Sequence, residues 1–140
     1  MKNIGLVLVF LLLSGLACGK FGASKSTSTS PLTVGELGAL KDKNPTELAA
    51  KYNGKKVIVV GEVLQVPFTY PGAYETFGYQ SILLTDHHGS AVDCQVTEAE
   101  AAKFKDLKID DVVTVTGTFK YEKSTMDIEG CSKATADNIK

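Results

Sequence analysis

Apolar residues first recur at helical spacing between residues 32 and 54. The stretch Asn44-Pro45-Thr46-Glu47 offers an N-cap, a proline at the first helical position and an acid in the first turn, while Asn53-Gly54 is typical of a left-handed helix end. An earlier segment, Thr33 to Lys41, begins with a threonine and an acid at capping-box spacing. The pattern therefore predicts two consecutive helices that cover a core.

The periodicity then changes to two, which is the repeat of a β-strand. Lys56 to Val66 is too rich in β-branched residues for a helix, and Gly61 in its middle predicts a bulge or a sharp bend. Tyr79 to Asp86 and Ser90 to Thr97 are two further predicted strands, joined by the short turn His87-His88-Gly89. A long bent strand followed by a hairpin is expected.

The last third of the chain adds a helix and two strands. Glu98 to Leu107 returns to helical spacing, with Thr97 and Glu100 placed as a capping box. Val112 to Lys123 alternates strictly, and Thr125 to Ala134 follows as a last strand. N-terminal helices, five strands and a helix between the third and fourth strands predict a mainly β protein, the five-stranded Greek-key barrel of the OB-fold. An antiparallel meander with helices packed on one face fits the same order.

Composition limits the number of domains and the kind of partner. The chain has 140 residues, 44% of them hydrophobic, and a formal net charge of -1, so one domain with a real core is expected. All 15 cationic side chains are lysines, and the chain has no arginine and no tryptophan. The planar guanidinium that binds phosphate or guanine in a bidentate way is therefore missing, and nucleic acid is not the expected partner.

The N-terminus has the pattern of an exported lipoprotein. Residues 1–17 are predicted to form a signal peptide, because a short positive start precedes the apolar run Ile4 to Leu13, which is too short to span a bilayer at ~20 residues per crossing. Leu16-Ala17-Cys18 resembles the end of a bacterial lipobox, in which the cysteine is lipidated and becomes the first residue. Gly15 departs from that pattern, so ordinary secretion with an unpaired Cys18 thiol is the alternative.

Residues 18–31 are predicted to be the lipidated Cys18 and a flexible tether rich in serine, threonine and glycine, and residues 32–140 to be the folded domain. The expected membrane contact is the N-terminal lipid, with palmitate as one acyl chain. By resemblance to the sorting rule of enteric bacteria, Gly19 after the cysteine favours the outer membrane. The predicted location is the bacterial cell envelope, on its periplasmic or its surface side.

Four segments resemble a known family. They are YNGKKVIVVGEV at residues 52–63, AVDCQV around Cys94, IDDVVTVTGTF at residues 109–119, and IEGC ending at Cys131. Together they are similar to the tRNA-anti-like OB-fold family found in bacterial envelope lipoproteins. The resemblance implies an OB-fold and a location in the cell envelope. It implies no activity, because the name of the family records the ancestry of its fold.

Cys94 and Cys131 are candidates for a disulfide. In an OB-fold the third and fifth strands are neighbours, so the two thiols can meet, and an oxidising compartment lets the bond form. The alternation raises a difficulty, because Cys131 is out of phase with Met126 and Ile128 on its own strand. A disulfide requires a bulge near Gly130, and otherwise both thiols remain free.

Few residues could carry catalysis or bind a metal. His87 and His88 are expected at an exposed hairpin tip, and a metal site there would need Asp86 or a distant carboxylate. Asp110-Asp111, with Asp106 nearby, is interpreted as a charged turn, although a weak Ca²⁺ site is the alternative. No nucleophile motif or phosphate-binding glycine loop is present. The prediction is a protein that is not an enzyme and uses no cofactor and no metal.

The segment Pro67 to Tyr79 is the candidate ligand-binding loop, because it holds five of the eleven aromatic residues. These are Phe68, Tyr70, Tyr74, Phe77 and Tyr79. In an OB-fold this loop borders the binding face, where the rings could stack on a ligand. Alternatively the rings fold over the barrel mouth as a lid. The predicted function is an extracytoplasmic binding module for an envelope protein or a glycan. The alternative is a structural, assembly or adhesin-like lipoprotein without a small-ligand site.

Overall fold

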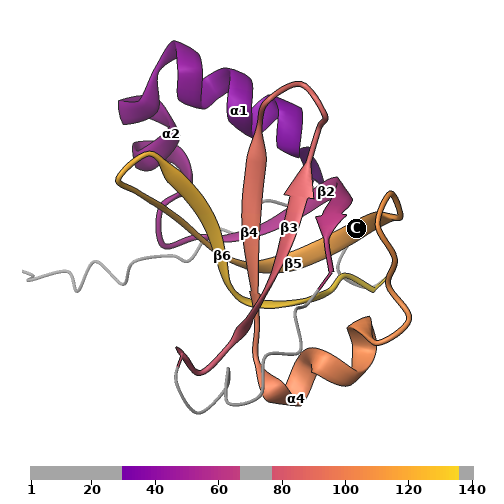
Figure 1. Cartoon of the computed structure of the whole chain (residues 1–140). Coiled ribbons are helices and arrows are strands. Elements are labelled where there is room, and N and C mark those ends of the chain that lie inside the picture. Colours follow the sequence, from indigo (N-terminus) through magenta and orange to yellow (C-terminus); the bar gives the residue numbers. More distant parts are fainter. Residues whose placement is uncertain (1–29, 67–76, 136–140) are drawn as a thin grey trace, which may run out of the picture.

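The computed structural model describes residues 30–66 and 77–135 of the chain (Figure 1). The helices and strands, in chain order, are β1 (Leu32–Thr33), α1 (Val34–Lys43), α2 (Pro45–Tyr52), β2 (Lys56–Gln65), β3 (Gln80–Thr85), β4 (Ala91–Val96), α4 (Glu98–Ala101), the 3₁₀ helix η1 (Ala102–Phe104), β5 (Val112–Glu122) and β6 (Thr125–Lys133). The predicted signal peptide, Cys18, most of the tether, Phe68, Tyr70 and Tyr74 lie outside the described residues. Within the described part of the chain, no helix is long and apolar enough to cross a membrane.

The strands form a closed barrel. Their order is β1-β2-β3-β4-β6-β5, and β5 pairs back with β2, so that the five strands β2 to β6 close on themselves. β4 and β6 run parallel, and every other pair of neighbours in the barrel is antiparallel. This is the OB-fold arrangement, and the prediction of a mainly β Greek-key barrel is confirmed. The parallel pair and the closure exclude the antiparallel meander.

The two N-terminal helices begin where the sequence predicts. The Thr33 hydroxyl accepts a hydrogen bond from the Glu36 amide at 3.1 Å, and the Glu36 carboxylate accepts one from the Thr33 amide at 2.7 Å. Asn44 caps α2 by accepting a hydrogen bond from the Glu47 amide at 3.1 Å, and Gly54 follows the helix at φ +71°. Both helices lie over one end of the barrel, and α4 lies at the other end (Figure 1).

β2 pairs with three strands, and Gly61 lies just before the residues that pair with β3. β1 pairs with β2 at Val59 and Val60. β2 pairs with β5 without interruption from Lys56 to Glu62, and its pairing with β3 begins at Glu62. The register break lies between Val63 and Gln65, so of the two alternatives predicted for Gly61 the bulge was wrong, and the sharp bend stays a prediction. Glycine is needed at position 61 because a Cβ there would lie 2.7 Å from the Val34 side chain. Close packing of α1 against the barrel therefore requires this glycine.

The helix between β4 and β5 is shorter than predicted. The α-helix ends at Ala101 and continues as η1, and Thr97 makes no side-chain cap bond, so the predicted capping box was wrong. The Glu100 amide donates to the Thr97 carbonyl at 3.0 Å instead of to the Thr97 hydroxyl, and the Glu100 carboxylate accepts hydrogen bonds from Lys103 at 2.7 and 2.9 Å. Phe104 is buried in the core at this end of the barrel.

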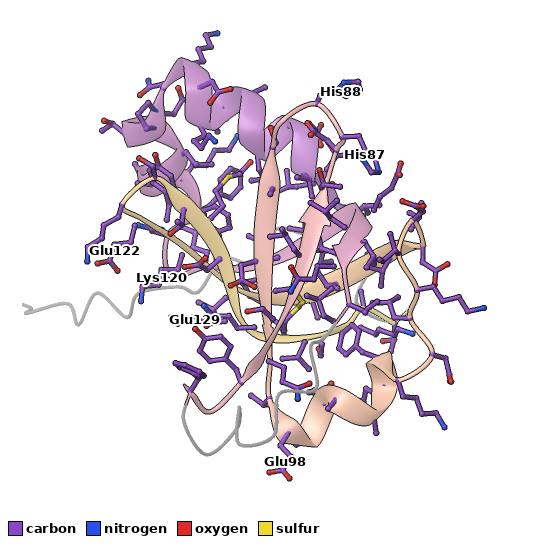
Figure 2. The ribbon with its side chains drawn as sticks, in the orientation of Figure 1. His87, His88, Glu98, Lys120, Glu122 and Glu129 are labelled. Carbon is purple, nitrogen blue, oxygen red and sulfur yellow. A yellow bond between two sulfur atoms is a disulfide. The ribbon has the colours of Figure 1, made fainter. Side chains whose placement is uncertain are left out.

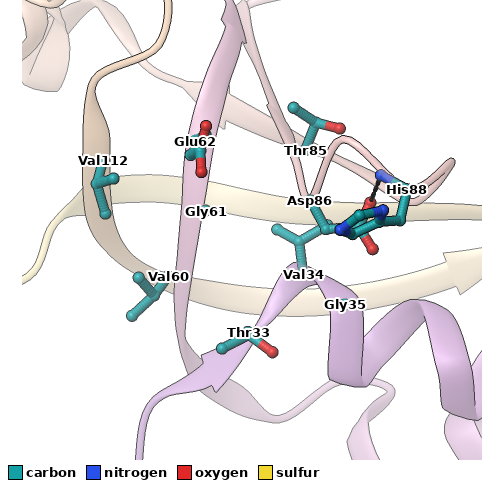
Figure 3. A pocket seen from close by; sticks show the side chains of 10 residues that line it. All are labelled: Thr33, Val34, Gly35, Val60, Gly61, Glu62, Thr85, Asp86, His88 and Val112. Carbon is teal, nitrogen blue, oxygen red and sulfur yellow. Dashed lines mark hydrogen bonds between the residues drawn. The ribbon is translucent and has the colours of Figure 1, made fainter.

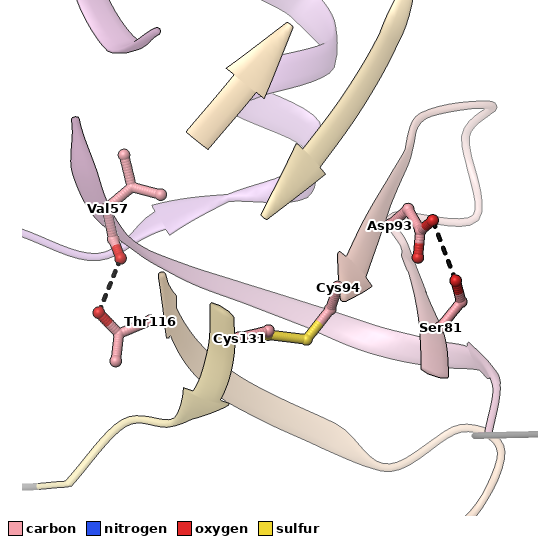
Figure 4. The surroundings of a disulfide bond; sticks show 6 residues. All are labelled: Val57, Ser81, Asp93, Cys94, Thr116 and Cys131. Atoms are coloured by element: carbon pink, nitrogen blue, oxygen red, sulfur yellow. Dashed lines mark hydrogen bonds between the residues drawn. A yellow bond between two sulfur atoms is a disulfide. The ribbon is translucent and has the colours of Figure 1, made fainter. Parts of the chain in front are cut away.

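A disulfide joins Cys94 of β4 to Cys131 of β6, with 5.5 Å between the Cα atoms (Figure 4). The β5–β6 register shifts here, so that Gly130 and Cys131 both lie opposite Gly117. Gly130 has φ +61°, as expected for a bulge that begins with a glycine in the left-handed region. The bulge near Gly130 that the alternation required is confirmed, and it turns Cys131 into the core.

Candidate functional site

The binding surface of OB-folds is the outer face of the second and third barrel strands, together with the loops beside it. In this chain those strands are β3 and β4, whose inward side chains are buried in the core. The alternate residues point outward, and the face continues onto β6 and β5. We call this surface the outer sheet face. Its members are Ser81, Leu83, Asp93, Gln95, Thr118, Lys120, Glu122, Asp127 and Glu129.

One row of this face crosses four strands. Leu83 of β3 lies opposite Asp93 of β4, which lies opposite Asp127 of β6, which in turn lies opposite Lys120 of β5. Side chains that are directly opposite on one face of a sheet are close enough to interact. The two carboxylates are therefore neighbours near the middle of the outer sheet face.

Lys120 is the cation of the outer sheet face, and it is paired with other carboxylates. Its Nζ lies 3.2 Å from Glu129 Oε1 and 3.6 Å from Glu122 Oε2. Figure 2 shows the three side chains gathered over β5 and β6. The hydrogen bond with Glu129 and the nearby negative charges raise the pKa of Lys120. The outer sheet face thus carries four carboxylates and one ammonium group, and its net charge is negative when all of them are ionised.

Asp93 is half-buried and incompletely paired. Ser81 Oγ donates a hydrogen bond to Asp93 Oδ2 at 3.1 Å (Figure 4), whereas the buried Oδ1 has no hydrogen-bond partner among the described residues. Burial raises the pKa of Asp93, and the charge of Asp127 adds to this effect. Burial also raises the pKa of Asp127. Removal from water disfavours the charged form of both acids.

A hollow of about 320 Å³ adjoins this carboxylate pair. Asp93 and Asp127 form part of its wall, together with Leu83 and Thr125. Lys41 of α1 lines it as well, and the Lys41 ammonium group lies 3.7 Å from the Asp42 carboxylate. The hollow has hydrogen-bond acceptors and an apolar wall, so it suits a group that donates hydrogen bonds, such as a sugar hydroxyl or an amine.

A second hollow, of about 310 Å³, lies between the start of α1, β2 and the β3–β4 turn (Figure 3). Asp86 on its rim accepts hydrogen bonds from the backbone amides of His88 at 2.8 Å and Ser90 at 3.0 Å. The bond from His88 is the main reason why the pKa of Asp86 is lowered. The oxygen that accepts both bonds is already engaged in holding the turn, which favours a structural role for this acid.

The structure places His87 and His88 at an exposed turn, where they were predicted. The sequence did not predict that His87 Nε2 lies 2.8 Å from Glu62 Oε2. This pair forms because β2 and β3 bring Glu62 opposite Thr85, close to the turn. Where the structure describes the chain, no group of three or more His, Cys, Asp or Glu residues could hold a metal ion.

The acidic residues before β5 are exposed and form a turn that holds the end of β2. Asp110 donates its backbone amide to the Val63 carbonyl at 2.8 Å, and the Val63 amide donates to the Asp111 carbonyl at 2.9 Å. The Asp111 carboxylate accepts a hydrogen bond from the Lys108 amide at 2.9 Å. Asp106 is exposed nearby in the chain. These contacts agree with the interpretation as a charged turn.

Two of the five loop aromatics are described. Phe77 is 64% exposed, and Tyr79 is half-buried just before β3. Tyr79 lies in a bend directly before β3 and two residues before Ser81 of the outer sheet face. Phe68, Tyr70 and Tyr74 lie outside the described residues. Whether the segment is a contact surface or a lid stays a prediction.

The carboxylate pair of the outer sheet face was not predicted from the sequence. Each acid alternates with buried neighbours, Asp93 before Cys94 and Asp127 between Met126 and Ile128, and this alternation signalled its outward position. The signal that was lacking is the parallel register of β4 and β6. That register cannot be read from either strand alone.

Comparison with known proteins identifies the fold. No known family model matches the sequence, and no curated protein shows significant similarity to it. A Klebsiella pneumoniae protein, provisionally named a nucleic acid-binding lipoprotein, is similar in structure with a TM-score of 0.60 and 14% identity, over 76% of this chain and 92% of that one. A provisionally named aspartyl-tRNA synthetase from Leishmania major matches over 81% of this chain and 22% of its own length, with 13% identity and a TM-score of 0.49. The similarity to the Klebsiella protein agrees with the OB-fold that the strand topology shows.

Proposed function

We propose that this chain is a lipid-anchored, extracytoplasmic OB-fold module that binds a protein or a glycan through the outer sheet face and the neighbouring segment 67–79. The lipobox-like Leu16-Ala17-Cys18 supports the anchor. The disulfide between Cys94 and Cys131 supports an oxidising compartment outside the cytoplasm. The resemblance to the tRNA-anti-like family of envelope lipoproteins points to the same address, and Gly19 favours the outer membrane.

The negative charge of the outer sheet face is the main reason for proposing a protein or a glycan as the ligand. A nucleic acid would bring its phosphates onto Asp93, Asp127 and the two glutamates that already hold Lys120. Like charges brought together at an interface oppose binding, and nucleic-acid affinity depends on cationic contacts to phosphate. Sugar hydroxyls and peptide donors can instead donate hydrogen bonds to these carboxylates. The name of the Klebsiella protein favours nucleic acid as the ligand. Binding of a labelled oligonucleotide tests that alternative.

The test for a macromolecular partner uses a photo-crosslinking amino acid at two positions. One variant carries it at Gln95, on the outer sheet face, and a matched control carries it at Val112, which is exposed at the start of β5. We expect adducts in the native cell envelope from position 95 and not from position 112. A glycan array, probed with the labelled wild-type domain, covers a carbohydrate ligand. Equal crosslinking from both positions, with no signal on the array, would contradict the proposed face.

The nucleic-acid alternative is tested by fluorescence anisotropy with a labelled single-stranded oligonucleotide. We expect no binding at about 150 mM salt, where exposed charges are screened beyond ~8 Å. Binding that appears only at low salt would reflect nonspecific lysine contacts. Tight binding at physiological salt would overturn the preference for a protein or glycan.

A further inference from the structure

The barrel closes through one short parallel seam. β4 and β6 pair in register at two positions, Asp93 with Asp127 and Cys94 with Ile128, whereas β2 and β5 pair at seven. We call these four residues the β4–β6 seam. Cys94 and Ile128 point into the core, so Asp93 and Asp127 share the outer side. The strands that complete the barrel therefore carry like charges at adjacent positions.

These like charges oppose the pairing of the two strands. Carboxylates directly opposite on one face of a sheet destabilise it. Water cannot relieve the effect fully, because Asp93 Oδ1 is buried and has no hydrogen-bond partner in the described structure. The one side-chain hydrogen bond described for Asp93 comes from Ser81 of β3 and is made to the other oxygen, Oδ2.

The neighbouring charges neutralise the pair only in part. Lys120 of β5 lies opposite Asp127, and its charge lowers the pKa of that acid. Its ammonium group also contacts Glu122 and Glu129, whose negative charges act in the opposite direction. From α1, Lys41 lines the adjoining hollow, and its ammonium group lies 3.7 Å from Asp42. Ser81 of β3 contributes a hydroxyl and no charge. Burial and the two glutamates therefore outweigh the attraction of Lys120, and the net effect is a raised pKa of Asp127.

The disulfide crosses the same pair of strands. Cys94 is the residue after Asp93 and bonds to Cys131 of β6, and both cysteines are fully buried. A covalent bond at this place limits how far β4 and β6 can separate. The repulsive contact and the crosslink thus act on one strand pair in opposite directions.

We propose that the β4–β6 seam is a proton-sensitive closure of the barrel, in which ionised Asp93 and Asp127 push the strands apart and the Cys94–Cys131 disulfide holds them together. This proposal does not depend on what the outer sheet face binds.

The direction of the pH effect follows from linkage. Burial raises the pKa of both acids above the ordinary value, so the folded domain binds more protons than the unfolded chain as the pH falls. The free energy of unfolding therefore rises as the pH falls through the raised pKa values that the two acids have in the folded domain. It stops changing once the pH is below the pKa that they have in the unfolded chain. At neutral pH the ionised pair lowers the stability of the barrel.

The test compares the thermal unfolding midpoint of the wild type with that of Asp127→Asn at several pH values. Asparagine has nearly the same shape and no charge. We expect the variant to unfold about 3 °C above the wild type near pH 7, since a cross-strand charge contact is worth under about 1 kcal/mol. The difference should shrink as the pH falls through the raised pKa values of the two acids, because protonation removes their charges. The control Glu98→Gln removes an exposed carboxylate at α4 (Figure 2) and should follow the wild type at every pH.

A second measurement tests the role of the disulfide. Reduction of the bond should lower the unfolding midpoint more in the wild type than in Asp127→Asn near pH 7, and by similar amounts in both at a pH below the raised pKa values of the two acids. If a reduced wild type does not fold at neutral pH, recovery of folding by Asp127→Asn gives the same information. A difference between Asp127→Asn and the wild type that is independent of pH, or an equal loss on reduction at both pH values, would overturn the proposal.

Discussion

Gly38 of α1 lies so close to Ser90, the residue before β4, that a Cβ at position 38 would overlap the Ser90 hydroxyl. Alanine is a better helix former than glycine by about 1 kcal/mol, but overpacking a close contact costs about 1–3 kcal/mol. We therefore expect Gly38→Ala to lower the free energy of unfolding by about 1 kcal/mol or more, measured by urea denaturation. Ala39→Ser, at the next and exposed position, is the control and should change it little. A stabilised Gly38→Ala variant would show that α1 does not pack as described.

Gly61 allows a second close contact with α1, and this contact can be tested as a pair. A Cβ at position 61 would meet the Val34 side chain at 2.7 Å and Leu84 Cβ at 3.0 Å. Gly61→Ala should reduce the free energy of unfolding by about 2 kcal/mol. The loss should be smaller in a Val34→Ala background, because that change removes the nearer obstacle. A double-mutant cycle measures this coupling, and strictly additive effects would contradict the contact.

The sequence predicts local features of this fold better than long-range ones. The caps at Thr33 and Asn44 were predictable because each joins residues three apart in the chain. The bulge at Gly130 could be deduced because Cys131 had to change face for its sulfur to reach Cys94. The role of Gly61 was misread, since the residue that requires it lies on a separate helix.

The candidate site shows the same limit. The outward position of Asp93 follows from the alternation of its own strand. That Asp127 lies beside it follows only from the parallel register of β4 and β6. The contact of His87 with Glu62 likewise depends on how β2 and β3 pair. Side chains that meet across strands cannot be matched until the strand register is known.

The proposed lipid anchor is tested at Cys18. Because a lipobox cysteine carries the acyl chains, Cys18→Ala should lose palmitate labelling and leave the membrane fraction of cells. Cys94→Ala is the matched cysteine control and should keep the label if the domain still folds. Labelling that persists in Cys18→Ala would rule out this residue as the anchor.

The aromatic segment 67–79 is proposed to contact the ligand beside the outer sheet face. Tyr70 and Tyr74 allow a direct test of this role. If their rings form an exposed contact surface, Tyr70→Ala with Tyr74→Ala should leave the unfolding midpoint nearly unchanged and abolish the crosslink or glycan signal. If the rings cover the barrel mouth, the same double change removes buried aromatic area. Truncation of a packed aromatic side chain costs about 3–5 kcal/mol, so the domain would then unfold at a much lower temperature.

The control for this pair is Phe77→Ala, because Phe77 is 64% exposed and its loss should not affect stability under either alternative. Thermal unfolding and the binding signal are measured on the same protein preparations. Loss of binding with an unchanged midpoint would support a contact surface, since the fold is then intact while the ligand is lost. A strong loss of stability with binding retained below the new midpoint would show that the rings belong to the core and that the ligand is held by the outer sheet face alone.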